Sequence, residues 1–252
     1  MMRLRTIALL VGLATMLAGC SGKNWGWYVL SPDTESGRNN LLFLLGGFKT
    51  TIALSLISFV LAVILGLLIA LPALYGNRPF RIINRLYVEP FRAVPSLVLI
   101  LWVYYGMPVV LGIKLEAFSA GIVALAFSES AFLAEIFRAG IQSVGRGQEE
   151  AADAIGLTFV DKMRFVVMPQ AIRRILPPLG NQFVYMLKMS ALVSVIGLED
   201  LTRRANELVT SEYRPLEVYT FLILEYLILI LIVSAGVRWL ERAMRSDERY
   251  GR

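Results

Sequence analysis

Long apolar segments alternate with shorter polar ones along most of this chain. Each apolar segment approaches the roughly 20 residues that a helix needs to cross the hydrocarbon core of a bilayer. Residues 41–49 form an amphipathic lead-in to the first segment, and the pair Pro177-Pro178 suits the start of the fourth. The pattern therefore predicts an all-α membrane protein with five transmembrane helices, over residues 50–71, 93–113, 117–134, 177–198 and 218–237.

The composition supports one membrane domain. Hydrophobic residues make up 57% of the 252 residues and charged residues 17%, whereas soluble chains carry roughly 25% charged residues. The mean hydropathy is +0.64. The sequence has no histidine, which excludes imidazole chemistry and histidine-bound metals, and its single cysteine, Cys20, excludes an internal disulfide. No metal site is predicted.

The first 20 residues have the pattern of a secretory signal, with Arg3 and Arg5 ahead of an apolar core. The signal ends in Leu-Ala-Gly-Cys, which resembles a bacterial lipobox, after which Cys20 would be lipidated and become the mature N-terminus. An uncleaved signal anchor is the alternative. Residues 21–40 then form an external polar segment, in which Trp25, Trp27 and Tyr28 are candidates for the membrane interface.

The distribution of arginine and lysine gives the same orientation by an independent route. If the mature N-terminus lies outside, then the loops 72–92 and 147–178 and the C-terminal tail 244–252 all lie inside. These segments, with the end of the last span, hold most of the basic residues, as the positive-inside rule requires. The C-terminus is therefore predicted to be cytoplasmic. The net charge of +6 reflects topology, and nucleic-acid binding has no support.

The polar loop 147–178 has an internal structure of its own. Residues 148–155 contain no glycine or proline, which favours a short helix, and Gly156 is its expected stop. A second helix is expected from about Phe159 to Val167, with Pro169 marking its end or a kink. Small side chains in the first helix would let another protein approach closely.

Spacing in this loop points to a known family. Glu150-Ala151-Ala152 is followed after three residues by Gly156, and nine residues later by Val166-Val167-Met168-Pro169. This pattern resembles the EAA motif of permease subunits of ATP-binding-cassette importers, with Val166 and Met168 in place of the usual isoleucine and leucine. The resemblance covers roughly residues 45–243. Within the family, the chain is most similar to the polar amino-acid branch (histidine and glutamine permeases). The segments that carry this similarity are residues 92–95, 105–108, 131–141, 168–171, 176–179, Asn181, Lys188 and Ser190. Met189 departs from that branch, which usually has aspartate there.

The resemblance implies a type I importer permease domain over residues 41–243, located in the bacterial inner membrane. It implies a second permease subunit (a copy or a relative), ABC ATPase subunits and an extracytoplasmic substrate-binding protein. The chain has no phosphate-binding loop of the G-x-x-x-x-G-K-[ST] type, so ATP and Mg²⁺ belong to the ATPase and this chain is not an enzyme. The residues that would couple it to the ATPase are Glu149, Glu150, Ala151, Ala152, Ile155, Gly156, Leu157 and Pro169.

Three ionisable residues lie within predicted spans, where such groups mark a pathway by default. Glu129 lies between Ser128 and Ser130 and either lines the substrate pathway or pairs with Lys188. Glu225 has the same alternatives or contacts a partner subunit. The candidate pathway set is therefore Ser128, Glu129, Ser130, Lys188, Ser190 and Glu225. Glu135 and Arg138 are spaced for a helical ion pair.

Other functions remain open at this point. A permease of the same architecture for another small polar solute, such as an opine or an amino-acid derivative, fits the same residues. A membrane-embedded enzyme would use Glu129 and Glu225 as an acid/base pair, and a scaffold or channel would need neither. The last two leave the spacing between Glu150 and Pro169 unexplained.

Overall fold

A computed structural model describes residues 26–245, and all of its regular elements are helices. The signal segment with Cys20, and Trp25, lie outside the described residues. The helices are η1 (Trp27–Leu30), α2 (Glu35–Leu45), α3 (Gly47–Tyr75), α4 (Arg78–Ala93), α5 (Ser96–Leu101), η2 (Trp102–Gly106), α6 (Met107–Leu111), α7 (Ala117–Gln142), α8 (Arg146–Ala154), α9 (Phe159–Asp161), η3 (Lys162–Val167), α10 (Met168–Met189), η4 (Ser190–Ile196), α11 (Leu201–Glu212) and α12 (Pro215–Arg245).

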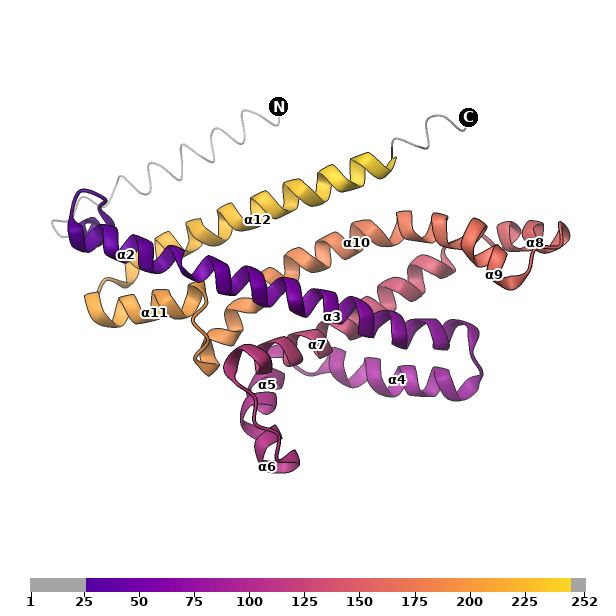
Figure 1. Cartoon of the computed structure of the whole chain (residues 1–252), viewed down its shortest axis with the longest axis horizontal. Helices are drawn as coiled ribbons and strands as arrows, with labels where there is room; N and C mark the ends of the chain where they lie inside the picture. Colours follow the sequence, from indigo (N-terminus) through magenta and orange to yellow (C-terminus); the bar gives the residue numbers. More distant parts are fainter. Residues whose placement is uncertain (1–25, 246–252) are drawn as a thin grey trace.

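The long helices α3, α10 and α12 run along the long axis of the molecule (Figure 1). α8 lies at one end of this bundle, and α2 and α11 lie at the other. Four helical segments in the described range are long and apolar enough to cross a membrane, and a bent pair would make a fifth. The four are Glu35–Tyr75, Ala117–Gln142, Phe159–Ile196 and Pro215–Ala243.

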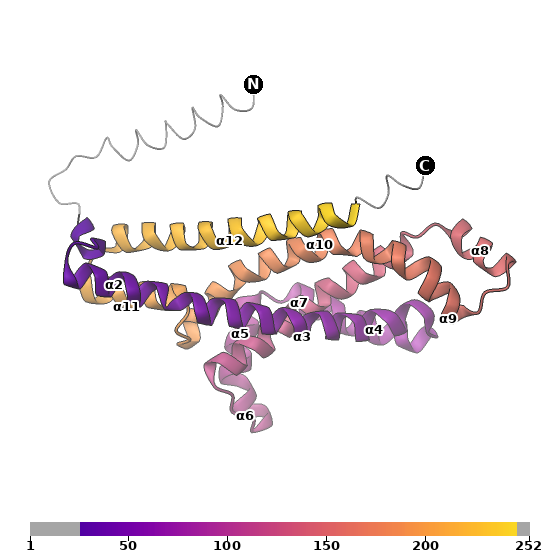
Figure 2. The ribbon, with the colours of Figure 1, turned by 45° about the horizontal axis from the view of Figure 1, so that its top comes forward.

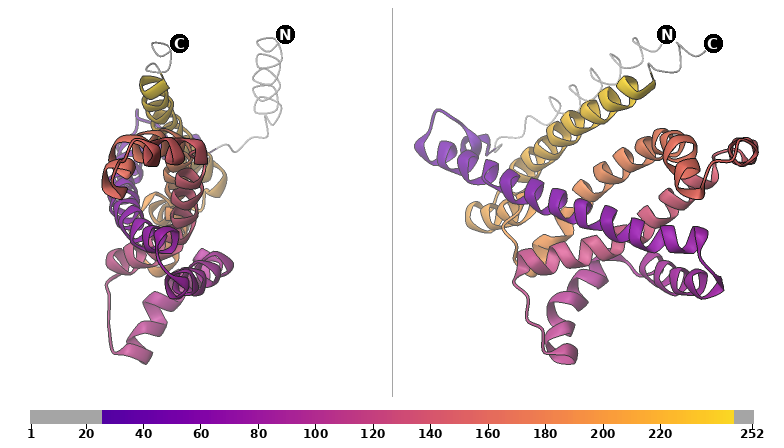
Figure 3. Two further views of the ribbon diagram at one scale, coloured as in Figure 1. Left: turned by 90° about the vertical axis from the view of Figure 1, so that its right-hand side faces the viewer. Right: turned by 45° about the vertical axis from the view of Figure 1, so that its right-hand side comes forward.

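The predicted bounds of the second span and of the loop before it differ from those in the structure. Most of the expected loop 72–92 is the helix α4, which is joined to the helical arm Ser96–Leu111 through a bend of 101°. α4 is strongly amphipathic, so a search for continuous apolar residues passes over it. Val94 is extended and precedes Pro95, which disfavours helical geometry at that residue. Figure 2 shows α5 and α6 leaving the bundle at this bend, and Figure 3 shows the same along the long axis.

The fourth span also begins earlier than expected. One helical segment runs from Phe159 to Ile196, so Pro177 and Pro178 lie inside α10 rather than at its start. Pro169 is in the first turn of α10, within one continuous helical segment, so it does not end the second helix of the loop. The preceding turn, Lys162–Val167, is a π-helix. Within a bundle of helices, neighbouring groups can satisfy the carbonyls that proline leaves unpaired, so its interruption of the backbone ladder is tolerated.

α3 packs against α7 more extensively than any other pair of described elements does. Its buried face carries small residues at helical spacing: Thr51, Ser55, Ser58, Ala62, Gly66 and Ala70. A Cβ atom at Gly66 would lie 3.0 Å from Leu133 Cβ and 3.1 Å from the Ser130 carbonyl oxygen. Small residues allow the close backbone approach on which helix association in membranes depends.

Gly66→Leu is expected to lower the free energy of unfolding by about 1–3 kcal/mol, because the new side chain overpacks the contact between α3 and α7. Gly236→Leu is the matched control, since a Cβ at this helical glycine meets nothing within 4 Å. Thermal unfolding of the detergent-solubilised protein checks both. Equal melting temperatures for the two variants would contradict the account of this contact.

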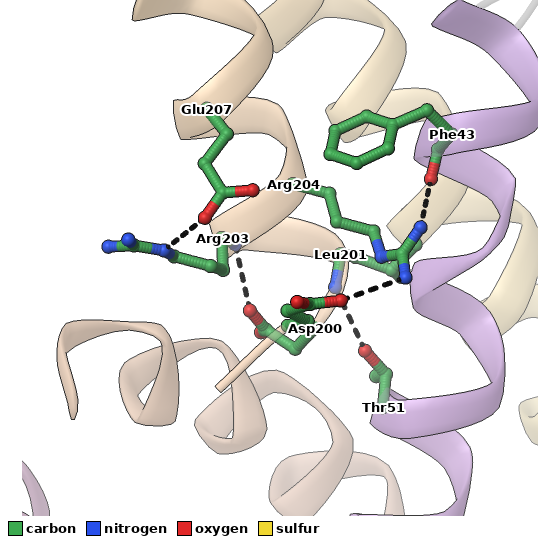
Figure 4. Close-up of polar contacts among 8 residues, drawn as sticks. Phe43, Thr51, Asp200, Leu201, Arg203, Arg204 and Glu207 are labelled. Carbon is green, nitrogen blue, oxygen red and sulfur yellow. Dashed lines mark hydrogen bonds and ion pairs between the residues drawn. The ribbon is translucent and has the colours of Figure 1, made fainter. Parts of the chain in front are cut away.

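A polar joint ties α3 to α11 (Figure 4), at the end of the bundle opposite α8 (Figure 1). The Asp200 carboxylate caps α11 by accepting from the Arg203 N–H at 2.8 Å. The Leu201 N–H donates to Thr51 Oγ1 at 3.2 Å. Arg204 donates to the carbonyl of Phe43 at 2.8 Å, and its guanidinium lies 4.9 Å from the centroid of the Phe43 ring. Together these contacts fix α11 against the start of α3.

Asp200 is fully buried in this joint, outside the candidate spans. Burial raises the pKa of its carboxyl to about 6, although backbone hydrogen bonds act in the opposite direction. The unfolded pKa is about 3.9, so the folded state holds this proton more tightly. The protonated Asp200 carboxyl therefore contributes fully to stability below about pH 4, and this contribution is lost as the pH rises through about 6.

Asp200→Asn retains a capping oxygen and removes the ionisation. At about pH 7.5 we expect the variant to have a higher melting temperature than the wild type and a free energy of unfolding larger by at most about 3 kcal/mol. Near pH 4 we expect both differences to vanish. Melting curves across this range provide the measurement. Asp200→Ala loses the cap and is expected to cost about 1 kcal/mol relative to Asp200→Asn at every pH. Parallel pH profiles for the wild type and Asp200→Asn would refute the assignment.

Candidate functional site

The first helix of the predicted coupling loop is confirmed as α8, Arg146–Ala154. It ends where expected, because Gly156 has a φ of +76°, in the left-handed region that glycine adopts without strain. The Gly156 N–H donates to the Asp153 carbonyl at 3.0 Å, and the Leu157 N–H donates to the Ala152 carbonyl at 3.1 Å. The chain thus turns sharply after α8 and enters α9.

A side-chain contact fixes α8 against the next helices. Lys162 Nζ lies 2.8 Å from Asp153 Oδ1 and 2.9 Å from Asp153 Oδ2. Thr158 caps α9 by accepting from the Asp161 N–H at 3.2 Å. The two short helices are therefore held as one unit at the end of the bundle (Figure 1).

The predicted coupling residues differ in how far they reach the surface. Ile155 is 76% exposed, and Glu150 and Ala151 are also exposed. Glu149 and Leu157 are half-buried. Ala152 is only 2% exposed, so its expected direct contact with the ATPase needs correction: it packs inside this chain. Pro169 is exposed at the start of α10.

Three consecutive residues of α7 make a polar hub with three other helices. Ser128 Oγ lies 3.1 Å from Ser96 Oγ of α5, and Ser130 Oγ lies 2.6 Å from the Tyr87 hydroxyl of α4. Successive helical residues point about 100° apart, which is why neighbours in sequence reach different helices. Ser128 and Ser130 thereby tie α7 to both sides of the bend between α4 and α5.

Glu129 occupies the centre of this hub and is 1% exposed. Gln182 of α10 donates a hydrogen bond to Glu129 Oε2, while Glu129 Oε1 has no hydrogen-bond partner among the described residues. The alternative of a Glu129–Lys188 ion pair is not realised in the described structure, where Lys188 is exposed. A buried carboxylate with a free oxygen is an acceptor available to a hydrogen-bond donor.

The remaining candidates do not join the hub. Ser190 is buried and donates to the carbonyl of Leu187 at 2.8 Å, one turn back on its own helix. Glu225 on α12 is 3% exposed, and neither of its carboxylate oxygens has a hydrogen-bond partner in the described residues. Glu225 and Lys188 form no ion pair there either. The expected pair Glu135–Arg138 is confirmed at 2.6 Å.

Sequence reasoning missed the residues that complete the hub, Tyr87, Ser96 and Gln182. Each has only a weak signal, a single polar group next to or within an apolar segment. Their role depends on the bend after α4 and on the early start of α10, neither of which was predicted. Within residues 26–245 no group of three or more metal-binding side chains occurs. Chemically, the hub offers hydroxyls, one amide and one carboxylate, with Ser128, Glu129 and Ser130 buried.

The arrangement of helices, loop and hub now permits comparison with known proteins. Residues 62–246 match the family model of the binding-protein-dependent transport system inner membrane component. The chain belongs to this family. It is therefore a multi-pass inner-membrane permease, and its role is transport rather than catalysis.

Individual relatives agree with this assignment. A probable glutamine ABC transporter permease of Bacillus subtilis (strain 168) is 37% identical over 83% of this chain and 96% of its own. The arginine transport system permease protein ArtQ of the same organism is 35% identical over 82% of this chain and 94% of its own. The crystal structure of an amino acid ABC transporter with histidines is 40% identical, with a TM-score of 0.78 over 82% of this chain and 97% of that one. The type I permease fold is confirmed.

Family membership also implies the classes of partner. ABC permeases act with an ATPase that hydrolyses ATP, and this family depends on substrate-binding proteins. The permease subunit itself holds no catalytic site for that hydrolysis.

Gly156→Val is expected to release the end of α8, because a side chain in the left-handed region costs about 1–2 kcal/mol and valine is β-branched. Hydrogen exchange of the amides of residues 151–157 should accelerate by roughly 5–30-fold, the equivalent of that cost. Gly147→Val is the matched control, since Gly147 lies in α8 without a positive φ and with open space around its Cβ position. Equal protection in both variants would contradict the role assigned to Gly156.

Proposed function

We propose that this permease is the membrane subunit of an ATP-driven importer for polar amino acids. The observation that carries the proposal is α8, an exposed helix with a glycine stop at one end of the bundle and with the EAA spacing around it. The names of the relatives, glutamine and arginine permeases, support the substrate class. The mature N-terminus lies outside, and α8 and the C-terminus lie in the cytoplasm.

Coupling to the ATPase occurs through the exposed part of α8 and the turn after it. Ile155 and Ala151 enter an apolar groove on the ATPase, and Glu150 pairs with basic residues at its rim. Ala152 supports this surface from within, because it is buried against the permease. The Asp153–Lys162 ion pair keeps α8 and α9 together when the ATPase moves. Motion is thereby passed into α10, which is continuous with η3.

The substrate pathway passes the hub of α7. Glu129 offers its free oxygen to the ammonium group of an amino acid, and Ser128 and Ser130 supply hydroxyls beside it. Access requires α4, α5 or α10 to move, because the hub is buried in this conformation. Lys188 is exposed on α10 and faces the second permease subunit or the pathway between the two. The second subunit is another copy or a related chain.

The proposal is tested by ATP hydrolysis in proteoliposomes that contain the permease and its ATPase. Binding proteins loaded with glutamine, arginine or histidine are added on the external side. We expect one loaded binding protein to stimulate hydrolysis and Glu150→Lys to abolish the stimulation. Glu116→Lys is the control, since Glu116 is exposed at the start of α7 and makes no side-chain cap bond. A wild-type permease that never associates with an ATPase would refute the proposal.

Glu129→Gln is expected to lower uptake at least tenfold while the variant still assembles with its ATPase. The amide replaces a charged acceptor by a neutral one, and hydrogen bonds to charged groups are worth about 1.5–3 kcal/mol. Uptake of radiolabelled amino acid by proteoliposomes measures the effect, and basal ATP hydrolysis verifies assembly. Ser190→Ala is the control, because the Ser190 hydroxyl donates to the Leu187 carbonyl and does not join the hub. Unchanged uptake and unchanged cargo preference in Glu129→Gln would remove Glu129 from the pathway.

A further inference from the structure

A charged cavity lies away from the hub, between the end of α3, α4 and the second half of α7. Its volume is about 580 Å³. Its charged lining consists of four arginines and two glutamates, Arg81, Arg85, Arg92, Arg138, Glu89 and Glu135. We name it the arginine cavity.

The two glutamates are already matched by arginines of the same cavity. Glu135 receives two hydrogen bonds from Arg138, at 2.6 and 3.1 Å. Glu89 lies 3.5 Å from Arg85, its neighbour one turn back on α4. Arg81 and Arg92 form no ion pair in the part of the chain that the structure describes, and both are exposed. These two guanidinium groups leave the arginine cavity with an excess of positive charge.

The arginine cavity continues into an apolar surface. A second hollow of about 300 Å³ on α4 is lined by Arg78, Arg81, Ile82, Arg85 and Leu86. Arg81 and Arg85 thus belong to both hollows. Ile82 and Leu86 are exposed, at 58% and 70%, and lie one turn apart on the helix. A ligand that fills both hollows must carry negative charge at one end and a hydrocarbon chain at the other.

We propose that the arginine cavity binds an anionic phospholipid of the cytoplasmic leaflet. Its phosphate lies against Arg81 and Arg92, and an acyl chain lies along Ile82 and Leu86. The location in that leaflet rests on the orientation given under the proposed function. Basic pockets between helices on the cytoplasmic side are suited to anionic headgroups, and guanidinium groups match phosphate oxygens in geometry. The bound lipid stabilises α4 against α3 and α7.

The test measures binding of a fluorescent phosphatidylglycerol to the purified permease–ATPase complex in neutral detergent. Arg81→Gln combined with Arg92→Gln should weaken binding by about 30-fold, since each basic residue near a membrane surface contributes about 1 kcal/mol, or about fivefold. The control pair Arg238→Gln and Arg242→Gln removes the same charge from the surface of α12 and should leave binding nearly unchanged. Replacing Arg81 and Arg92 by lysine keeps the charge but loses the guanidinium geometry, and should give an affinity between those of the wild type and the glutamine variant.

Competitors separate a lipid from a free anion. Unlabelled phosphatidylglycerol should displace the probe, whereas phosphatidylcholine and inorganic phosphate should not. Ile82→Ser with Leu86→Ser should weaken binding of the lipid. Three outcomes would overturn the proposal. Inorganic phosphate could compete as well as the lipid, or the arginine variant could bind as tightly as the control variant. The arginine variant could also elute without its second permease subunit. Glu150→Lys, which is expected to abolish the stimulation of ATP hydrolysis, should bind the lipid normally, so failure of the two proposals is distinguishable.

Discussion

The close contact between α3 and α7 is the constraint on which the rest of the structure depends. Small residues on one face of α3 let the backbones approach, and Gly66 lies directly against Leu133 and the Ser130 carbonyl. This contact orients α7, so that Ser128, Glu129 and Ser130 point at α5, α10 and α4. Lipid gives helices no hydrophobic reason to associate, so packing and hydrogen bonds must hold them. A bulky side chain at Gly66 would disturb the hub by pushing against the Ser130 backbone.

The hub and α8 are connected by helices rather than by a loop. α10 carries Gln182, the partner of Glu129, and is continuous with η3, whose Lys162 pairs with Asp153 of α8. Movement of α8 therefore acts on α10, the helix whose Gln182 donates a hydrogen bond to the buried carboxylate of Glu129. A π-helical turn such as Lys162–Val167 is frequently found at functional sites. The joint around Asp200 fixes the far end of the bundle, so that displacement at one end is not lost at the other.

Features that depend on neighbouring residues in the sequence, such as the length of a short helix and its stop, could be predicted. α8 and its stop at Gly156 follow from helix propensity and from the freedom of glycine at positive φ, and both were predicted. α4 was not, because an amphipathic helix that includes Pro90 and several arginines looks polar to a search for apolar runs. Pro177 and Pro178 suggested a helix start, but the surrounding bundle accommodates them within α10. The burial of Ala152 and the partners of Glu129 depend on tertiary packing, which spacing does not encode.

The most direct test of the central claim, that α8 is the contact with the ATPase, is photo-crosslinking in membranes. A photoreactive amino acid at Ile155 samples the exposed turn after α8, and one at Val195 samples an exposed position in η4 at the other end of α10. The account predicts that Ile155 crosslinks to the ATPase subunit and that Val195 does not. Crosslinking to the ATPase from Val195 alone, or from neither position in an active complex, would contradict it.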